Sequence, residues 1–226
     1  MKKPYRLLYV GLLLSSGCLT STTEEIRIPA EQLAWQPYHN GDVLRFGQDR
    51  SSNVRTFLIT EIKEEFIEYS IGGNAPVYLG PPKKIRAQTL DVYARRTDTV
   101  RYVATPASTP NKPDSVVFTT PTNLLSLGAS ESGGYAYLNW DVTFSAELPL
   151  RQITTGYPLY DTTQVLLPRL QLGGVAYDSV LRISNARSAG ILYGLPRAKP
   201  VRRVYYAKAF GVVGFVEGGT LWYRLP

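Results

Sequence analysis

The chain has 226 residues, of which 44% are hydrophobic and 19% are charged, a balance typical of a folded protein rather than a disordered one. Its formal net charge of +7 falls to +4 when Lys2, Lys3 and Arg6 are left out as part of a leader. This mild charge, without a basic stripe or a nucleic-acid-binding motif, argues against a nucleic-acid partner. The 16 tyrosines and the 12% aromatic content favour strands, because flat side chains pack well on a pleated sheet.

The N-terminus has the layout of an export signal. Residues 1–6 are basic, residues 7–14 (LLYVGLLL) are a short apolar run, and residues 15–17 are small. The apolar run is too short to cross a bilayer, which takes about 20 residues. We therefore expect residues 1–17 to be a signal peptide that is cleaved.

Cys18, the only cysteine of the chain, follows directly, so an intrachain disulfide is excluded. The run LSSGC that ends at Cys18 resembles the lipobox of bacterial lipoproteins, in which the cysteine is diacylated and the chain is cut just before it. The resemblance implies that Cys18 carries acyl chains such as palmitate. This sequence departs from the family at Ser15, where a leucine is usual, and Ser15-x-Gly17 would also suit an ordinary signal peptidase.

Lipidation would fix the location of the protein. Each buried CH₂ contributes about 0.8 kcal/mol, so two or three acyl chains on one residue form a stable anchor. Residues 18–25 are then the lipidated cysteine and a polar tether, and residues 26–226 form the β domain. We expect this domain at the cell envelope, on the outer membrane, at either the periplasmic face or the cell surface.

Most of the mature chain has the pattern of strands joined by short polar turns. Residues 54–62 and 66–71 predict a hairpin with the charged residues 63–65 at its tip, and residues 90–94 and 100–104 predict a second hairpin. The same pattern predicts strands at residues 42–46, 164–172 and 177–184.

The segment from Tyr135 to Leu148 alternates strictly between apolar and polar residues. It predicts one long, bent strand of about 43 Å at about 3.3 Å per residue. The pair Gly218-Gly219 predicts a tight turn between strands at 204–217 and 220–225, with Val213, Phe215 and Leu221 on shared faces.

Helix signals are scarce, and only residues 30–36 predict a short helical turn. The expected fold is therefore all-β: a single strongly curved antiparallel sheet, as a half-barrel or open barrel, with few or no helices.

Few residues suggest catalysis. His39 is the only histidine and lies in a turn sequence, so a zinc-type ligand set is absent and no metal or cofactor is expected. The run 128–132 (GASES) resembles a nucleophile elbow but lacks its second glycine and its strand-to-helix context. We expect no catalytic residue and no enzymatic activity.

Three further groups admit a function besides a structural role. The carboxylates Glu61, Glu64, Glu65 and Glu68 would be the candidates for an envelope glycosidase, although a solvated strand edge explains them as well. The tyrosines could stack on sugars or simply pack the sheet. The basic residues Arg197, Lys199, Arg202 and Arg203 are either a solvated loop or a contact for anionic lipid or polysaccharide.

Both ends of the mature chain carry a family pattern. Residues 204–213 (VYYAKAFGVV) with Trp222 at one end, and Trp35-x-Pro37-Tyr38 at the other, resemble small lipoproteins of unknown function from Bacteroidota. The resemblance implies a shared sheet rather than a shared reaction. The expected function is a membrane-anchored lipoprotein with a binding or structural role; the alternative is a carrier or binder of a hydrophobic ligand or a glycan on the curved sheet.

Overall fold

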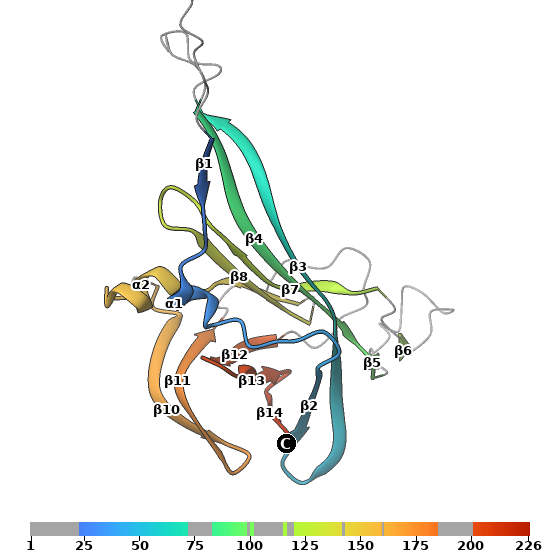
Figure 1. The fold of residues 1–226 in the computed structure, drawn as a ribbon. Helices are drawn as coiled ribbons and strands as arrows, with labels where there is room; N and C mark the ends of the chain where they lie inside the picture. Colours follow the sequence, from blue (N-terminus) through green and yellow to red (C-terminus); the bar gives the residue numbers. More distant parts are fainter. Residues whose placement is uncertain are drawn as a thin grey trace, which may run out of the picture.

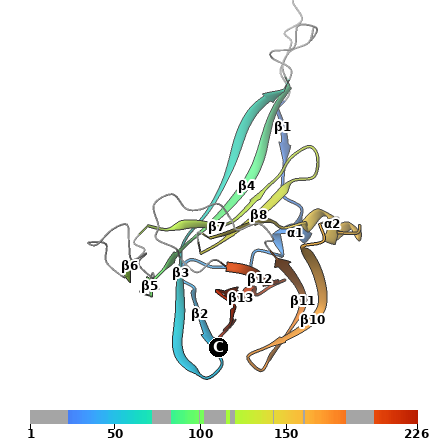
Figure 2. The same cartoon turned by 180° about the vertical axis from the view of Figure 1, so that it is seen from behind.

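The computed structural model describes residues 23–71, 83–98, 100–101, 115–116, 120–141, 143–159, 161–184 and 201–226. Almost all of its strands belong to one curled, largely antiparallel sheet of 12 strands that forms a half-barrel (Figures 1 and 2). The predicted fold class is confirmed, because the described residues contain only two short helices beside this sheet.

The strand order along the sheet is β10-β11-β12-β13-β14-β2-β3-β4-β7-β8-β9, with β1 paired to β4 and with β5 and β6 forming a separate ribbon. The elements, in chain order, are β1 (Thr23–Ile26), α1 (Ala30–Leu33), β2 (Val43–Gln48), β3 (Ser51–Ile71), β4 (Lys83–Arg96), β5 (Val100–Arg101), β6 (Ser115–Val116), β7 (Thr122–Gly128), β8 (Tyr135–Trp140), β9 (Phe144–Glu147), α2 (Leu150–Thr155), β10 (Gln164–Leu172), β11 (Val175–Ser184), β12 (Val201–Ala207), β13 (Gly211–Glu217) and β14 (Thr220–Arg224).

The two edge strands of the curled sheet, β9 and β10, approach each other beside α2. Gln164 Nε2 of β10 donates a hydrogen bond of 2.9 Å to the carbonyl of Glu147 in β9. The helix α2 follows Pro149 and ends at Gly156, whose left-handed φ of 74° suits a C-terminal glycine. This contact narrows the open side of the half-barrel.

The concave interior is filled by an aromatic cluster. Phe46 contacts Phe57, Trp140 and Phe215 with ring centroids 5.2–5.9 Å apart, and all four side chains are buried. Since these rings come from β2, β3, β8 and β13, the cluster joins both halves of the curled sheet. A smaller apolar cluster on the other face of the C-terminal strands contains Leu172, Tyr177, Val180, Ala207 and Val213.

Three sequence-based expectations about strands are wrong. β3 runs through residues 63–65 without a turn and pairs with β4 from Phe57 to Ile71, so the predicted hairpin tip does not exist. β4 ends at Arg96, and β5 pairs with β6 instead of returning along β4; residues 102–104 lie outside the described residues. The segment 135–148 is a hairpin of β8 and β9, because the chain turns at Asp141.

The C-terminal hairpin is confirmed, with Gly218 and Gly219 at positive φ between β13 and β14. The expected sharing of faces fails for two reasons. Phe215 pairs with Trp222 while Leu221 pairs with Val216, which puts Leu221 on the face opposite to Phe215, and a β-bulge lies where β12 pairs with β13. Val213 therefore packs in the smaller cluster, whereas Phe215 faces the main core beside Trp222 at 6.2 Å. The short helical turn near residue 30 and the strands near residues 42, 164 and 177 are confirmed.

Candidate functional site

The predicted lipidation site, Cys18, lies outside the described residues, but the start of β1 shows where the chain arrives. Thr23 pairs with Lys84 at the beginning of β4, next to the end of β3. Figure 1 shows β1 running beside the long β3–β4 hairpin, which extends away from the rest of the sheet. The N-terminal end of the described chain therefore lies at the tip of this extension.

The outer, convex face of β3, β4, β7, β8 and β9 carries regular rows of polar and aromatic residues. One row joins Lys63, Asp91, Ser126, Tyr137 and Glu147, which are consecutive register partners across the five strands. Partners in antiparallel strands project their side chains from the same face. The row therefore forms a continuous surface opposite the aromatic core.

A polar network occupies the middle of this outer face. Asp91 Oδ1 accepts hydrogen bonds from Asn123 Nδ2 at 2.8 Å and from Ser126 Oγ at 2.5 Å. Asn139 Oδ1 accepts from Ser145 Oγ at 2.8 Å, and Asn139 Nδ2 lies 3.4 Å from Asn123 Oδ1. The carboxylate and the two amides are thus held in fixed positions by neighbouring strands.

Two exposed tyrosines border the network. Tyr135 and Tyr137 are 41% and 44% exposed, and their ring centroids are 5.8 Å apart. A Cβ atom on Gly128 would lie 2.2 Å from the Tyr135 ring, so the glycine allows this ring to lie flat against the sheet. Ile67 and Tyr69, 49% and 39% exposed, extend the apolar part of the face along β3. We call these four side chains with the polar network the outer binding face.

A second polar group is buried inside the half-barrel. The Arg96 guanidinium, 4% exposed, donates to Asp98 at 2.9 and 3.0 Å and to Asp141 at 2.6 Å, and its Nη1 lies 3.6 Å from Glu217. Arg55 completes the charge cluster through Asp98 at 3.3 Å and Glu217 at 3.2 Å. Two guanidinium groups thus hold three carboxylates from distant parts of the chain.

Asp141 is the least favourably placed member of this charge cluster. Burial raises its pKa from 3.8 to about 6, although the Arg96 charge beside it acts in the opposite direction. Its backbone has a φ of 47°, a left-handed conformation that costs energy for residues other than glycine, although aspartate and asparagine adopt it more readily than most. Asp141 therefore carries both an electrostatic and a conformational cost.

The charge cluster was missed in the sequence analysis, although a signal was present. Arg96 continues the inward phase of Val92 and Ala94 on β4, and Glu217 continues the inward phase of Phe215 on β13. A charged residue in the buried phase of a strand needs a buried partner of opposite charge. The sequence did not identify the partner, because the residues are far apart along the chain.

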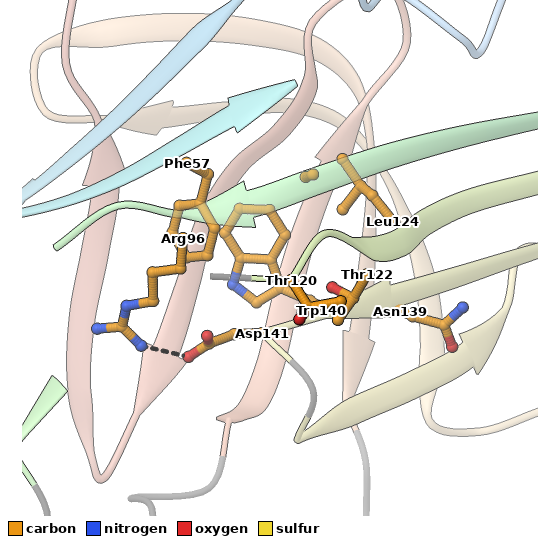
Figure 3. A pocket seen from close by; sticks show the side chains of 9 residues that line it. Phe57, Arg96, Thr120, Thr122, Leu124, Asn139, Trp140 and Asp141 are labelled. Carbon is orange, nitrogen blue, oxygen red and sulfur yellow. Dashed lines mark hydrogen bonds and ion pairs between the residues drawn. The ribbon is translucent and has the colours of Figure 1, made fainter. Parts of the chain in front are cut away.

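A small cavity adjoins Asp141 and Arg96. The other residues that line it include Phe57, Leu124, Trp140, Asn139, Thr120 and Thr122 (Figure 3). Its free volume of about 20 Å³ holds roughly one water molecule. The cavity is therefore too small for a sugar or a lipid chain.

A larger groove lies between α2 and the edge strand β10. Its volume is about 430 Å³, within the range of small-molecule sites, and its apolar lining includes Ile153, Tyr157, Leu159 and Leu166. Tyr157 is 65% exposed. This groove is the place where a hydrophobic ligand would fit.

The residues considered for catalysis do not come together. His39 is 85% exposed and lies 3.6 Å from Asp42, and Ser130 Oγ is engaged within its own turn with Ser132 and with the N–H of Gly134. Neither side chain forms a contact with the charge cluster among the hydrogen bonds and ion pairs of the described residues.

The glutamates proposed for a glycosidase are divided between the two faces of β3. Glu61 and Glu65 share a face with Tyr93 and Thr89, whereas Glu64 and Glu68 pair with Leu90 and Arg86 on the other. Opposite faces of one strand cannot present these carboxylates to one substrate. Asp141 and Glu217 are close together, but Arg96 pairs with both and their side chains are only 8% and 7% exposed.

The basic stretch is described only in part. Arg202 and Arg203 are exposed on β12, and Arg197 and Lys199 lie outside the described residues.

Within the described ranges, no group of three or more His, Cys, Asp or Glu residues has the geometry to hold a metal ion. No helix in the same ranges is long and apolar enough to cross a membrane.

The chain matches no protein-family model, no curated protein and no solved structure.

Proposed function

We propose that the chain is a lipoprotein of the bacterial cell envelope, anchored through acylated Cys18, whose outer binding face binds a glycan. The arrangement of Tyr135 and Tyr137 beside the network around Asp91 carries this proposal. Exposed tyrosine rings offer a flat apolar surface with a polar edge, which suits the C–H face of a sugar ring. The carboxylate and amide groups beside them accept and donate hydrogen bonds, as sugar hydroxyls require.

Preorganisation supports this function. Asp91, Asn123 and Asn139 are already linked by hydrogen bonds, so binding does not require them to be ordered. The Tyr135 ring is likewise supported from below by Gly128. A binding role without chemistry fits these contacts, because the buried carboxylates nearby are paired with Arg96 and are closed to a substrate of sugar size.

The groove between α2 and β10 supports a second candidate, binding of a hydrophobic ligand. Its volume and its apolar lining favour such a ligand over a glycan. A variant of Tyr157 in this groove therefore separates the two candidates from each other.

Anchoring is tested by Cys18→Ser. We expect the wild-type protein to partition into detergent and to stay on membranes in high salt, because acyl burial is hydrophobic and is not screened. The Cys18→Ser variant should lose incorporation of radiolabelled palmitate and appear as uncleaved precursor or as a soluble form. Normal labelling and membrane retention of this variant would contradict the proposal.

Glycan binding is tested by affinity gel electrophoresis of the soluble domain in gels that contain laminarin, xylan, mannan or dextran. We expect retardation by at least one of these polysaccharides and a loss of about tenfold or more in affinity for Tyr135→Ala/Tyr137→Ala, which corresponds to about 1.4 kcal/mol. Tyr157→Ala, a matched exposed tyrosine, should bind like the wild type. Retardation that depends on Tyr157 and is unaffected by the double variant would refute a glycan site on the outer binding face.

A further inference from the structure

The N-terminal strand and the β3–β4 hairpin end at the same place. Thr23 pairs with Lys84, and Lys83 pairs with Ile71 at the end of β3. β1 is parallel to β4, so the chain enters at this end and then runs toward the body of the half-barrel. We define the arm as β1 together with residues 66–71 of β3 and residues 83–88 of β4, and the arm tip as its end at Thr23 and Lys83.

The attachment of β1 to the arm is reinforced by side chains. Lys83 Nζ lies 2.6 Å from Glu24 and 2.7 Å from Glu131, and Arg86 lies 3.4 Å from Glu25. Such exposed ion pairs contribute little individually, about 0–1 kcal/mol. Just after β1, a buried contact ties the chain to β4: the Ile28 N–H donates a hydrogen bond of 2.9 Å to Gln88 Oε1. The direction of the chain from Thr23 to Ile28 is therefore set by the sheet.

The distance between Cys18 and the arm tip has a strict upper limit. Five residue steps separate Cys18 from Thr23, and a fully extended chain spans at most about 3.6 Å per residue. The anchor is thus within roughly 18 Å of the arm tip, less than the thickness of the hydrocarbon core of a bilayer, about 30 Å.

We propose that the arm tip faces the bilayer and contacts its headgroup region, and that the arm holds the body away from the membrane. This inference rests on the proposed anchoring through Cys18. Asp91, in the outer binding face, lies seven residues from Lys84 along β4, or about 23 Å at 3.3 Å per residue. Arg96 lies twelve residues from Lys84, or about 40 Å. The polar network around Asp91 therefore stands clear of the lipid surface, whereas Ile67 and Tyr69 lie on the arm beside its tip. The charge cluster lies farther from the arm tip than this network.

Two single labels measure this orientation. Because Cys18 is the only cysteine and is acylated in the mature protein, an added cysteine is the sole free thiol. Ser70→Cys places a donor fluorophore near the arm tip, and Ser52→Cys places it at the other end of β3, up to about 59 Å away along the strand. Both serines are exposed, so neither label disturbs the core.

The two labelled lipoproteins are reconstituted into phosphatidylcholine vesicles that carry an acceptor dye on a fraction of the headgroups. We expect energy transfer at least threefold more efficient from position 70 than from position 52. Equal transfer, or stronger transfer from position 52, with both proteins on the vesicles, would overturn the orientation and leave the anchoring intact. Failure of both proteins to float with the vesicles would overturn the anchoring and the orientation together.

Discussion

At the scale of single residues, Asp141 combines features that oppose stability. It is buried, its pKa is raised to about 6 by burial, and its backbone is left-handed. The folded protein binds a proton at Asp141 more tightly than the unfolded chain, whose carboxylate titrates near 3.8. Stability contributed by this group is therefore present at low pH and is lost as the pH rises from about 4 through about 6.

The first prediction concerns Asp141→Asn. Asparagine tolerates the left-handed backbone and can still accept a hydrogen bond from Arg96, so the change removes the titration and retains the geometry. We expect the free energy of unfolding of the variant to increase relative to that of the wild type between pH 4.5 and pH 7, by about 2 kcal/mol, because only the wild type loses the contribution of the protonated carboxyl. Urea unfolding at pH 4.5, 5.5 and 7 measures this. Parallel pH profiles of the two proteins would contradict the predicted role of Asp141.

A second residue-scale feature explains why glycine stands at position 211. Gly211 has a φ of 74°, and a Cβ atom there would lie 2.2 Å from Tyr38 Oη. Tyr38 Oη also accepts a hydrogen bond of 2.9 Å from the N–H of Val212. The glycine therefore permits both the turn and the close approach of the tyrosine.

We predict that Gly211→Ala costs about 2–4 kcal/mol in the free energy of unfolding, because backbone strain and a core clash act together. Gly174→Ala is the matched control, since Gly174 has a φ of 82° but no heavy atom within 4 Å of its would-be Cβ. The control should cost only the backbone strain, about 1–2 kcal/mol. Equal losses for the two variants in urea unfolding would show that the contact with Tyr38 does not matter.

At the scale of elements, the sequence predicted the presence of strands more reliably than it predicted their ends. Alternation in residues 135–148 is genuine, but it continues through a turn because Trp140 and Phe144 on either side both face the core. Periodicity alone cannot distinguish one long strand from a tight hairpin whose two strands keep the same phase. In β3 the error was the opposite one, because a turn was expected where the strand continues. The charged residues 63–65 lie on a continuous strand, and the outer part of this strand packs against little of the core.

The edge strand β10 shows how an element is protected from unwanted pairing. Pro168 lies in the middle of β10, where it offers no N–H to a neighbouring chain. Its neighbours Leu167 and Arg169 pair with β11, but Pro168 itself has no register partner there. Leu166 beside it is 40% exposed. An edge strand that exposes this apolar side chain would otherwise offer a continuous row of N–H groups to a strand of another molecule.

We predict that Pro168→Val increases self-association of the soluble domain, because it restores a donor and adds a strand-forming residue at an open edge. Pro168→Lys, which restores the same N–H but adds a charge, should stay monomeric. Size-exclusion chromatography with light scattering at rising protein concentration distinguishes the two. A Val variant that stays monomeric throughout would indicate that Pro168 does not protect the edge.

At the scale of the whole molecule, the all-β half-barrel was predictable because alternation and turn glycines recur from end to end. The two glycine pairs before β8 and β11 are turns at positive φ, as their sequence indicates. The lipoprotein-like patterns at the two ends of the chain also meet in space. Trp35 stacks on Tyr206 at 6.3 Å, and the Tyr206 hydroxyl donates to the Trp35 carbonyl. A packing role therefore accounts for these residues.

The outer binding face could be predicted only in part. Tyr135 and Tyr137 were visible as alternating tyrosines, but their neighbours Asp91 and Asn123 come from strands whose order is not written in the local pattern. The partners of a sheet residue depend on register, and register is set by core packing and by bulges that a single sequence does not reveal.

The parallel pairing of β1 with β4 has a mechanical consequence. If the chain is anchored through Cys18 as proposed, a pull on the anchor would act along the axis of β1, so its four residue pairs with β4 would be loaded in shear and share the tension. A strand pulled sideways would instead open one pair at a time. Since β4 also pairs with β7, force applied to a glycan bound as proposed on the outer face would pass through these two strands to the proposed lipid anchor. The arrangement suits a tether that must stay folded under drag.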